Sequence, residues 1–332
     1  MLGMESRAKY AAFLAELNEV PVFVEPWYLN AVCQKGTWGV VLAENRGKVD
    51  AALPYYQSRP DVITMPPLTQ VMGPIIRPIE QKYAAQLSRE KRLMGELIDQ
   101  LPKVRFFRQS FSPNVLNWLP FYWRGYQQTT RYTYRFDQLS DVDGLAAGMA
   151  SKLRGSLRKS EKQGVRVISR DDIAGFNKIV GMTFARQGMR NPLNPEMTER
   201  LYLAAKRKGA GELFFAVDDQ GRDHAAAFLV WNKWCSYNLA GGSDPQLRAS
   251  GAHSFVQWAL VKAARERSQT FDFEGSMVEG IESAFRAFGA RQVPYFSVWK
   301  DDRGWSTLLR KRLIARLVAA RRRLLPRNSR TR

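Results

Sequence analysis

The chain has 332 residues, 45% of them hydrophobic and 12% aromatic, which is enough for two domains with cores of their own and excludes a disordered chain. Its formal net charge of +20 favours anionic partners such as CoA phosphates, tRNA or an anionic lipid surface, without choosing among them.

In the first 140 residues, hydrophobic periodicity and turn residues predict helices alternating with strands. The expected helices cover residues 5–18, 26–34, 81–100 and 115–123, and the expected strands cover residues 38–44, 49–57, 104–110 and 128–136. The proline-rich stretch 64–78 is predicted to be a loop that lines a surface.

Residues 141–163 are predicted to form one helix that begins with acids and ends with bases. The bases are Lys152, Arg154, Arg158, Lys159 and Lys162. One interpretation is a solvated connector whose end charges complement the helix dipole. The patterns that follow predict a strand at 165–169, helices at 172–187 and 195–208, strands at 213–217, 224–232 and 234–240, a helix at 252–267, a strand at 270–273, a helix at 278–288 and a strand at 292–299.

A glycine-rich turn, residues 241–252, joins the strand at 234–240 to the helix at 252–267. Small residues at such a turn leave backbone N–H groups pointing outward at the positive end of the helix dipole, which suits a pyrophosphate. Arg248 lies beside the turn as a candidate salt partner.

Arg248-x-x-Gly251-Ala252 at the start of this helix resembles the acyl-CoA pyrophosphate loop of the GNAT N-acyltransferases, whose pattern is Gln/Arg-x-x-Gly-x-Gly/Ala. The order of elements around it is similar to a whole GNAT domain, and residues 271–276 resemble a sequence of the Fem-like branch (FemA, FemB, FemX). Fem proteins join two GNAT-like halves and move amino acids from aminoacyl-tRNA onto peptidoglycan precursors.

This resemblance implies an α/β (α+β) fold of two tandem GNAT-like domains, each with a mixed, mostly antiparallel sheet flanked by helices. The expected domains are residues 1–140 and 141–304, followed by a basic amphipathic tail at 305–332. It also offers a second interpretation of the basic helix at 141–163, close to the cleft that holds a phosphorylated substrate.

The order of elements repeats between the halves, which indicates an internal duplication. Hairpin turn 43–48 matches 217–222, strand residues 104–107 match 270–273, and helix end 121–126 matches 285–290. Where the second half has its glycine-rich turn, the first has residues 69–74, whose proline removes a donor. The interpretation assigns acyl-CoA, as co-substrate, to the second half and the acceptor side to the first.

The resemblance places the acyl carbonyl against a backbone N–H of the strand near residues 239–242. The predicted cofactor-binding residues are Leu239, Gly241, Gly242, Arg248, Ser250, Gly251, Ala252 and His253. His253 has an alternative interpretation as a first-turn surface residue.

For the chemistry, Glu274 and Asp272 are the candidate general bases, because strand alternation puts them on one face. The alternative is that an arginine satisfies these acids. Tyr295 is the candidate acid that returns a proton to the leaving group, or else a packed strand aromatic.

The predicted substrate-binding residues are Arg131, Tyr132, Arg158, Arg186 and Gln187. Arg186 and Gln187 also suit an ordinary helix end, with Gly188 as its stop. Two histidines without cysteine neighbours predict no metal site.

The tail contains ten Lys and Arg and no acid from Ser306 to Arg332, half of the excess charge. Apolar residues at steps of four and five put one stripe on a helix at 305–325, which suits an anionic membrane, RNA phosphates or the protein's own surface, the membrane being favoured. No apolar run approaches the ~20 residues that cross a bilayer, so we expect a cytoplasmic protein or one on the inner membrane face.

The sequence therefore predicts an N-acyltransferase that moves an acyl group from acyl-CoA to an amine, such as an amino sugar or a cell-envelope precursor. Two alternatives stay open: a Fem-type transferase that uses aminoacyl-tRNA, and a non-catalytic module that binds membrane or RNA.

Overall fold

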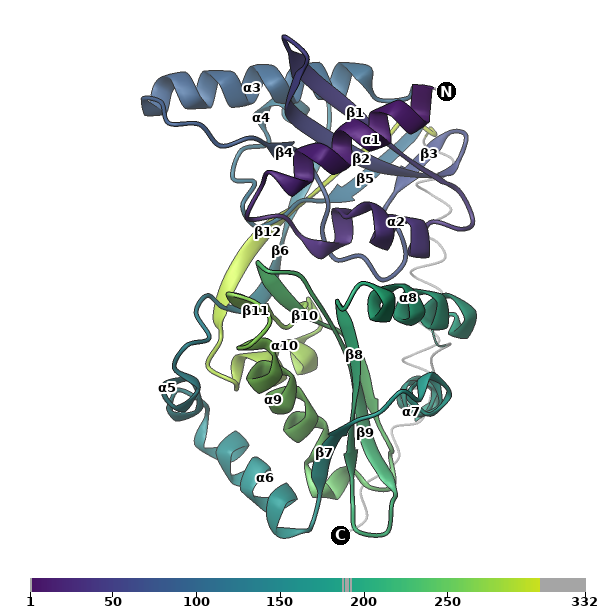
Figure 1. The fold of residues 1–332 in the computed structure, drawn as a ribbon, viewed down its shortest axis with the longest axis vertical. Coiled ribbons are helices and arrows are strands. Elements are labelled where there is room, and N and C mark those ends of the chain that lie inside the picture. The colour runs from purple at the N-terminus through teal and green to yellow at the C-terminus, as the bar shows by residue number, and fades with distance from the viewer. Residues whose placement is uncertain (1, 187, 189–190, 192, 305–332) are drawn as a thin grey trace.

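The computed structural model describes residues 2–186, 188, 191 and 193–304 (Figure 1). The first half contains the helices α1 (Leu2–Ala15), α2 (Pro26–Val32), α3 (Tyr83–Gln100) and α4 (Leu119–Tyr122) and the strands β1 (Thr37–Asn45), β2 (Lys48–Arg59), β3 (Val62–Thr64), β4 (Ile75–Ile76), β5 (Phe106–Ser110) and β6 (Gln127–Phe136). A short 3-10 turn, η1 (Val22–Val24), precedes α2.

The second half repeats most of this order, after two additional helices and the strand β7, and has β10 where the first half has β3 and β4. Its elements follow in chain order. They are α5 (Val142–Ala147), α6 (Ser151–Lys162), β7 (Arg166–Ser169), α7 (Ile173–Arg186), α8 (Pro195–Arg207), β8 (Gly211–Val217), β9 (Asp223–Trp231), β10 (Cys235–Ser243), η2 (Arg248–Ser250), α9 (Ala252–Ala264), β11 (Thr270–Asp272), α10 (Glu279–Arg286) and β12 (Arg291–Asp301). The fold is the expected mixed α/β architecture with helices on both faces of the sheet.

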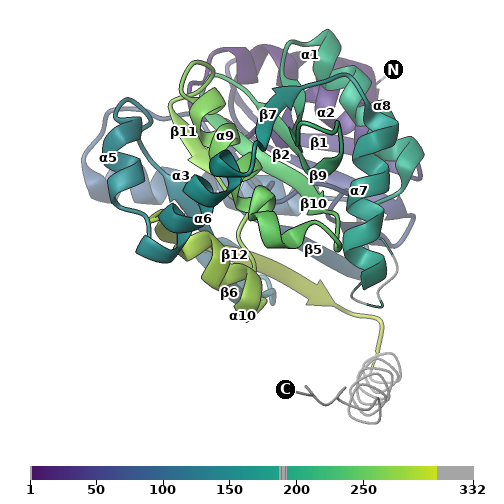
Figure 2. The ribbon, with the colours of Figure 1, turned by 90° about the horizontal axis from the view of Figure 1, so that it is seen from below.

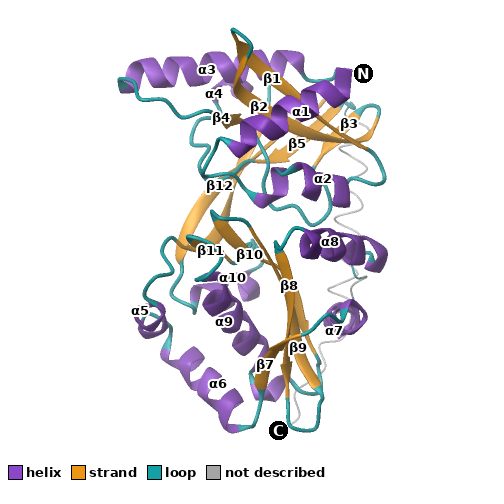
Figure 3. Ribbon diagram, viewed as in Figure 1, coloured by secondary structure: helices purple, strands orange, loops and turns teal. Residues whose placement is uncertain are grey.

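One sheet runs through both halves of the described chain, in the order β1-β2-β3-β5-β12-β6-β11-β10-β9-β8-β7, with β4 on β2 (Figure 3). The last strand of each half is exchanged: β6 pairs with β11 of the second half, β12 pairs with β5 of the first, and β6 and β12 pair with each other. Residues from both halves therefore meet at the centre of the sheet. The domain boundary between residues 140 and 141 stays a prediction.

Three clusters of buried side chains hold the layers together. The first joins α1, α2, α7 and α8 on one face of the sheet and spans both halves. On the opposite face, α6, α9 and α10 cover the strands of the second half, and α3 and α4 cover those of the first. Figure 2 shows α7 and α8 on one side of the strands and α6 and α9 on the other.

The single helix expected at 141–163 is wrong, because the chain breaks into α5 and α6. The Asp141 side chain caps α5 by accepting a hydrogen bond from the Gly144 amide at 2.8 Å. Between the helices, the Ala150 amide donates to the Ala287 carbonyl at 2.9 Å. This contact with the end of α10 replaces a helical hydrogen bond and redirects the chain.

Two other expectations need correction. The helix expected at 115–123 is only Leu119–Tyr122, and the stretch 64–78 contains a short strand, β4, paired with β2. β3 was also missed. Its residues are too few for a periodic pattern, and pairing with β2 and β5 stabilises them instead.

The repeated order supports the inferred duplication, with one shift. Arg135 and Trp299 each lie ten residues after a glycine of positive φ, Gly125 and Gly289. Arg135 pairs with Asp272, and Trp299 pairs with Arg108. β5 and β11 are therefore equivalent, but Asp272 matches Arg108 rather than the residue two places earlier that the sequence match gave.

Candidate functional site

A buried carboxyl group lies where β11 meets the exchanged strand β6. Asp272 is only 3% exposed, and its Oδ1 accepts hydrogen bonds from the Thr133 hydroxyl and, at 2.7 Å, from the Glu274 amide. Burial raises the pKa of Asp272 to about 6, although these hydrogen bonds and the nearby Arg135 oppose the shift. A carboxyl group of this kind is mostly ionised at neutral pH and is still a stronger base than an exposed one.

Glu274 lies two residues after the end of β11 and has a φ of 54°, which is uncommon for a residue with a side chain. Its buried Oε1 has no hydrogen-bond partner among the described residues. Burial, and then the charge of Asp272, raises its pKa well above the usual value. An unpartnered oxygen and a strained backbone at one position are features that cluster at functional sites.

Tyr295 of β12 lies on the same face as these acids and is 5% exposed. Its hydroxyl accepts a hydrogen bond from Nε of Arg131 at 3.2 Å. Burial raises the pKa of Tyr295, and Arg131 opposes this shift while Asp272 and Glu274 add to it. The structure therefore brings three predicted catalytic residues together with Arg131.

Tyr132 lies apart from this group. Because side chains alternate along β6, Arg131 and Thr133 face Asp272, and Tyr132 projects to the other face of the sheet, where it is 36% exposed. Of these two predicted substrate-binding residues, only Arg131 therefore lies beside the carboxyl pair.

Sequence reasoning assigned the acceptor side to the first half and named Arg131, but it missed Gln70 and Tyr28 of that half. Gln70 donates from Nε2 to the Thr133 hydroxyl at 3.2 Å, and its Oε1 is a buried atom without a partner in the described part of the chain. The buried Tyr28 hydroxyl donates to the Leu68 carbonyl, and the charge of Glu274 adds to the rise that burial causes in its pKa. The only sequence signal was the match of residues 69–74 with the glycine-rich turn.

The sequence predicted that Gly241 and Gly242 lie in the turn. They lie instead in the last part of β10, where they pair with β9. Gly242 allows a close approach of α7, since a Cβ there would lie 2.8 Å from the Thr183 hydroxyl and from the Val180 Cα. Leu239 lies at an irregularity of the β9–β10 pairing, and β10 pairs with β11 only as far as Tyr237. β11 ends at Asp272, the partner of Tyr237, whereas β10 continues to Ser243.

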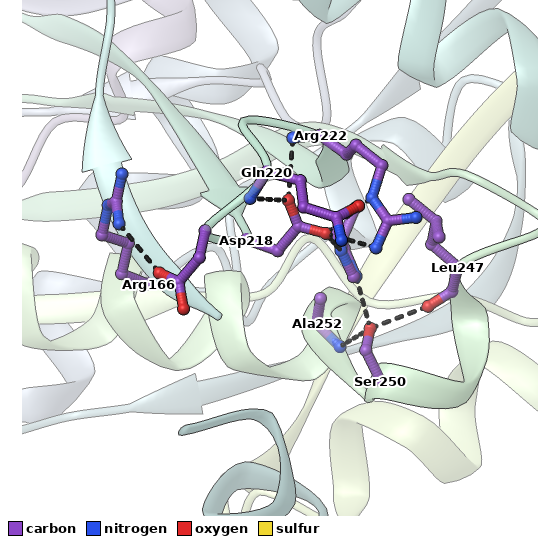
Figure 4. Close-up of polar contacts among 9 residues, drawn as sticks. Arg166, Asp218, Gln220, Arg222, Leu247, Ser250 and Ala252 are labelled. Carbon is purple, nitrogen blue, oxygen red and sulfur yellow. Dashed lines mark hydrogen bonds and ion pairs between the residues drawn. The ribbon is translucent and has the colours of Figure 1, made fainter. Parts of the chain in front are cut away.

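The turn itself covers residues 244–251, and Figure 4 shows its polar contacts. Gly251 has a φ of 76° and is the N-cap residue immediately before α9. The amides of Ser250, Gly251 and Ala252 already donate to the Leu247 carbonyl, the Arg248 carbonyl and the Ser250 hydroxyl. They are therefore not the outward-pointing donors that the sequence predicted.

Helix α6 covers this turn. Lys159 donates to the Ala249 carbonyl and Ser160 to the Ser250 carbonyl, both at 2.7 Å. A Cβ on Gly251 would lie 2.3 Å from the Ser156 hydroxyl, so this glycine is required for helix packing. Of the predicted donor-binding side chains, Arg248 is exposed beside α6.

His253 occupies the sixth position of the resemblance pattern, where Gly or Ala is expected. Burial lowers its pKa against the effect of a hydrogen bond to the Gly242 backbone, and its buried Nδ1 has no partner among the described residues. The side chain is thus neutral and half-buried rather than an exposed first-turn residue.

The other predicted binding residues do not join the carboxyl pair. Arg158 is exposed on α6 and Arg186 is exposed at the end of α7. Gln187 and the basic tail 305–332 lie outside the described residues. Two surface cavities lie elsewhere, one on α8 and one between the end of α3 and β5.

Two general features concern metals and membranes. No group of three or more His, Cys, Asp or Glu in the described ranges is arranged to hold a metal ion. Among the helices that the structure describes, none has the length and apolar character that crossing a bilayer requires.

Known proteins place this site in a family. Residues 147–291 match the family described as "Acetyltransferase (GNAT) domain". This part of the chain, which holds Asp272, Glu274 and the turn before α9, is a GNAT acetyltransferase domain. The match supports the prediction that the protein is an acyltransferase. No curated protein matches the sequence.

Solved structures extend the likeness across both halves. A FemX structure is similar with a TM-score of 0.63 and 14% identity over 87% of this chain and 95% of its own. The C-terminal domain of a putative lysylphosphatidylglycerol synthetase from Agrobacterium fabrum has a TM-score of 0.56 and 14% identity, over 91% of this chain and 93% of its own. A tandem GNAT protein of the clavulanic acid biosynthesis pathway has a TM-score of 0.51 and 11% identity, over 89% of this chain and 94% of its own. At these identities the likeness establishes the fold, a tandem GNAT architecture of the Fem-like kind.

Proposed function

We propose that this protein is an N-acyltransferase that moves an acyl group from acyl-CoA to an amine, with the carboxyl pair Asp272 and Glu274 receiving the proton of the amine. The observation that carries the proposal is the position of this pair, buried at the end of β11 beside the point where β10 leaves it. The GNAT resemblance places the acyl donor along the strand before the turn, which is β10 here.

The length of β10 suits an extended pantetheine arm. Tyr237 pairs with Asp272, and Ser243 ends the strand six residues later. At the rise of an extended chain these residues span roughly 20 Å. An extended pantetheine arm along this strand connects a thioester near the carboxyl pair with phosphates near Arg248.

The residues at the centre then have distinct roles. Asp272, with a pKa of about 6, accepts the proton that the amine loses as it attacks the thioester carbonyl. A backbone amide of the β10 segment near Leu239 stabilises the oxyanion. Tyr295, held by Arg131, returns a proton to the leaving thiolate. The acceptor is an amino sugar or a cell-envelope precursor, bound from the side of Gln70.

One observation favours a second donor. The amides at the start of α9 are already bonded and α6 packs on Gly251, which leaves less room for a diphosphate than the sequence suggested. An aminoacyl-tRNA ester requires no such cradle, and exposed bases on α6 suit its phosphates. This second candidate is a Fem-type aminoacyl transferase.

The experiment compares the two donors. We expect acetyl-CoA to raise the unfolding temperature of the full chain and to be consumed when glucosamine or a lysine-containing peptide is added. Arg248→Glu is expected to reduce the temperature shift. Lys48→Glu makes the same charge change on an exposed hairpin of the first half and leaves the shift intact. Consumption of aminoacyl-tRNA, with no shift from any acyl-CoA, would replace the first proposal by the second.

A further inference from the structure

Three buried side chains connect the β8–β9 turn with the turn that begins α9. Asp218, His224 and Ser250 are each 6% exposed. His224 lies between the others, with Nε2 at 3.0 Å from Oδ2 of Asp218 and Nδ1 at 2.9 Å from the Ser250 hydroxyl. They come from separate elements, and Figure 4 labels Asp218 and Ser250, the two ends of this chain of contacts.

Asp218 anchors this chain of contacts to its own hairpin. Its carboxylate accepts hydrogen bonds from the backbone amides of Gln220 and Arg222, at 3.0 and 2.9 Å, and from Nε of Arg222 at 2.7 Å. The contacts with His224 and Arg222 hold the pKa of Asp218 well below its usual value. As an ionised acceptor beside Nε2 at 3.0 Å, it fixes the orientation of the His224 ring.

At the other end, Ser250 ties His224 to the turn. Its hydroxyl donates to the Leu247 carbonyl at 2.7 Å and accepts from the Ala252 amide at 3.3 Å. One hydroxyl therefore contacts both ends of the segment 247–252 and the imidazole.

A serine, a histidine and an aspartate in this order also resemble a nucleophile triad. Two observations exclude that role here. The Ser250 hydroxyl is already bonded to the Leu247 carbonyl at 2.7 Å and to the Ala252 amide at 3.3 Å, and Ser160 of α6 packs on Ser250 by donating to its carbonyl at 2.7 Å. The hydroxyl holds the backbone, and it is not presented to a substrate.

We infer that Asp218, His224 and Ser250 form a positioning chain that fixes the turn 247–252, and with it Arg248, for the phosphates of the donor. The inference rests on the proposed function for its substrate, a phosphate-bearing acyl donor. The three residues do not touch the reacting atoms, so they act on donor binding and not on the chemical step.

The kinetic test uses His224→Ala, Ser250→Ala and the double variant in the full chain. Removal of a buried hydrogen bond to a charged group predicts a rise of roughly tenfold in the donor KM, with kcat within about twofold. Because the chain acts as one unit, the double variant should show about the same rise as either single variant. Arg166→Ala removes the neighbouring exposed pair with Asp219, at 3.2 Å, and should change neither constant.

Additive effects in the double variant, a fall in kcat with unchanged KM, or an equal effect of Arg166→Ala would each overturn the inference. If His224→Ala does not fold, Asp218→Asn takes its place, since it removes the charge that orients the ring.

Amide hydrogen exchange separates this inference from the proposed function. Without any donor, peptides that cover residues 244–255 should exchange faster in both single variants than in the wild type and in Arg166→Ala. Unchanged exchange refutes the positioning chain, whatever the enzyme does. Faster exchange in a protein that consumes no donor supports the chain and refutes the proposed function.

Discussion

The two halves of the molecule repeat most of their elements in the same order, yet only the second has a buried carboxyl group at the matched strand position. By the register of the exchanged strands, Arg108 on β5 occupies the place of Asp272 on β11. Arg108 is exposed, whereas Asp272 is 3% exposed and bonded to Thr133 of the other half. Duplication thus repeats the backbone, and the chemistry depends on which side chain stands at the junction.

The strand exchange explains why the first half is needed for a site in the second. β6 supplies Thr133 and Arg131, and the loop before β4 supplies Gln70. Isolation of the GNAT domain at 147–291 would remove all three and expose the edge of β11. The two halves form one functional unit.

The largest expected effect is at the matched strand position, which Asp272 occupies in the second half and Arg108 in the first. Asp272→Asn keeps the shape of the side chain and its acceptor oxygen but removes the base, so kcat/KM should fall by about 10²–10⁴. Arg108→Ala, the matched change in the first half, should leave kcat/KM within about twofold. Steady-state kinetics with the preferred donor measure both, and a loss below tenfold in Asp272→Asn would remove the carboxyl group from the mechanism.

The second prediction concerns stability and pH. Because burial raises the pKa of Asp272 to about 6, the folded state holds this proton more tightly than the unfolded chain. The stabilisation is fully present below the unfolded pKa of about 3.9 and is lost as the pH rises through about 6, a change of about 3 kcal/mol. Relative to the wild type, Asp272→Asn should therefore gain stability at pH 8 and not at pH 4.

Asp99 in the first half provides a control of opposite sign. Its hydrogen bond with Arg124 lowers its pKa, so its stabilisation is present above the unfolded pKa and is lost in acid. Asp99→Asn should lose a little stability at pH 8, and this loss should disappear only below about pH 4, as Asp99 becomes protonated in the folded state. Urea unfolding at both pH values measures the four differences, and equal signs for the two variants would contradict the assignment.

A third prediction compares two glycines at equivalent places after α4 and α10. Gly125 and Gly289 have φ angles of 79° and 81°, and either costs about 1–2 kcal/mol when replaced by alanine. At Gly125 the nearest atom to a new Cβ is Nζ of Lys300 at 3.9 Å, whereas at Gly289 it is the Gly148 carbonyl oxygen at 2.6 Å. Gly289→Ala should therefore cost about 1–3 kcal/mol more than Gly125→Ala in denaturant unfolding. Equal costs would show that the contact between α5 and the end of α10 can rearrange without a loss of stability.

Much of the fold could be predicted from local patterns. The order of helices and strands, the repeat and the GNAT-like second half all follow from periodicity, turn residues and a short loop resemblance. β3 and β4 were not predictable, because they are too short for a pattern and depend on pairing partners distant in sequence.

The candidate site was predictable in part. Asp272 and Glu274 were found because acids at the end of an otherwise apolar strand require an explanation. Thr133 and Gln70 were not, since their role depends on the exchange of β6, which no local signal reveals. The glycine-rich turn misled for a related reason: Gly242 and Gly251 serve the close approach of α7 and α6, and the sequence shows only that small residues are required.

The smallest expected effect concerns the hairpin turns, where the halves should behave alike. Gly47 and Gly221 have φ angles of 78° and 75°, and no atom lies within 4 Å of a Cβ built on either. Asparagine tolerates this conformation, so Gly47→Asn and Gly221→Asn should each change the free energy of unfolding by less than about 1 kcal/mol. Valine, whose branched Cβ does not tolerate it, should cost about 1–2 kcal/mol or more at both positions. Equal responses at the two turns, beside unequal responses at Gly125 and Gly289, would place the difference between the halves at the helix contacts and the strand junction. A larger cost at Gly221 than at Gly47 would instead extend that difference to the hairpin that carries Asp218.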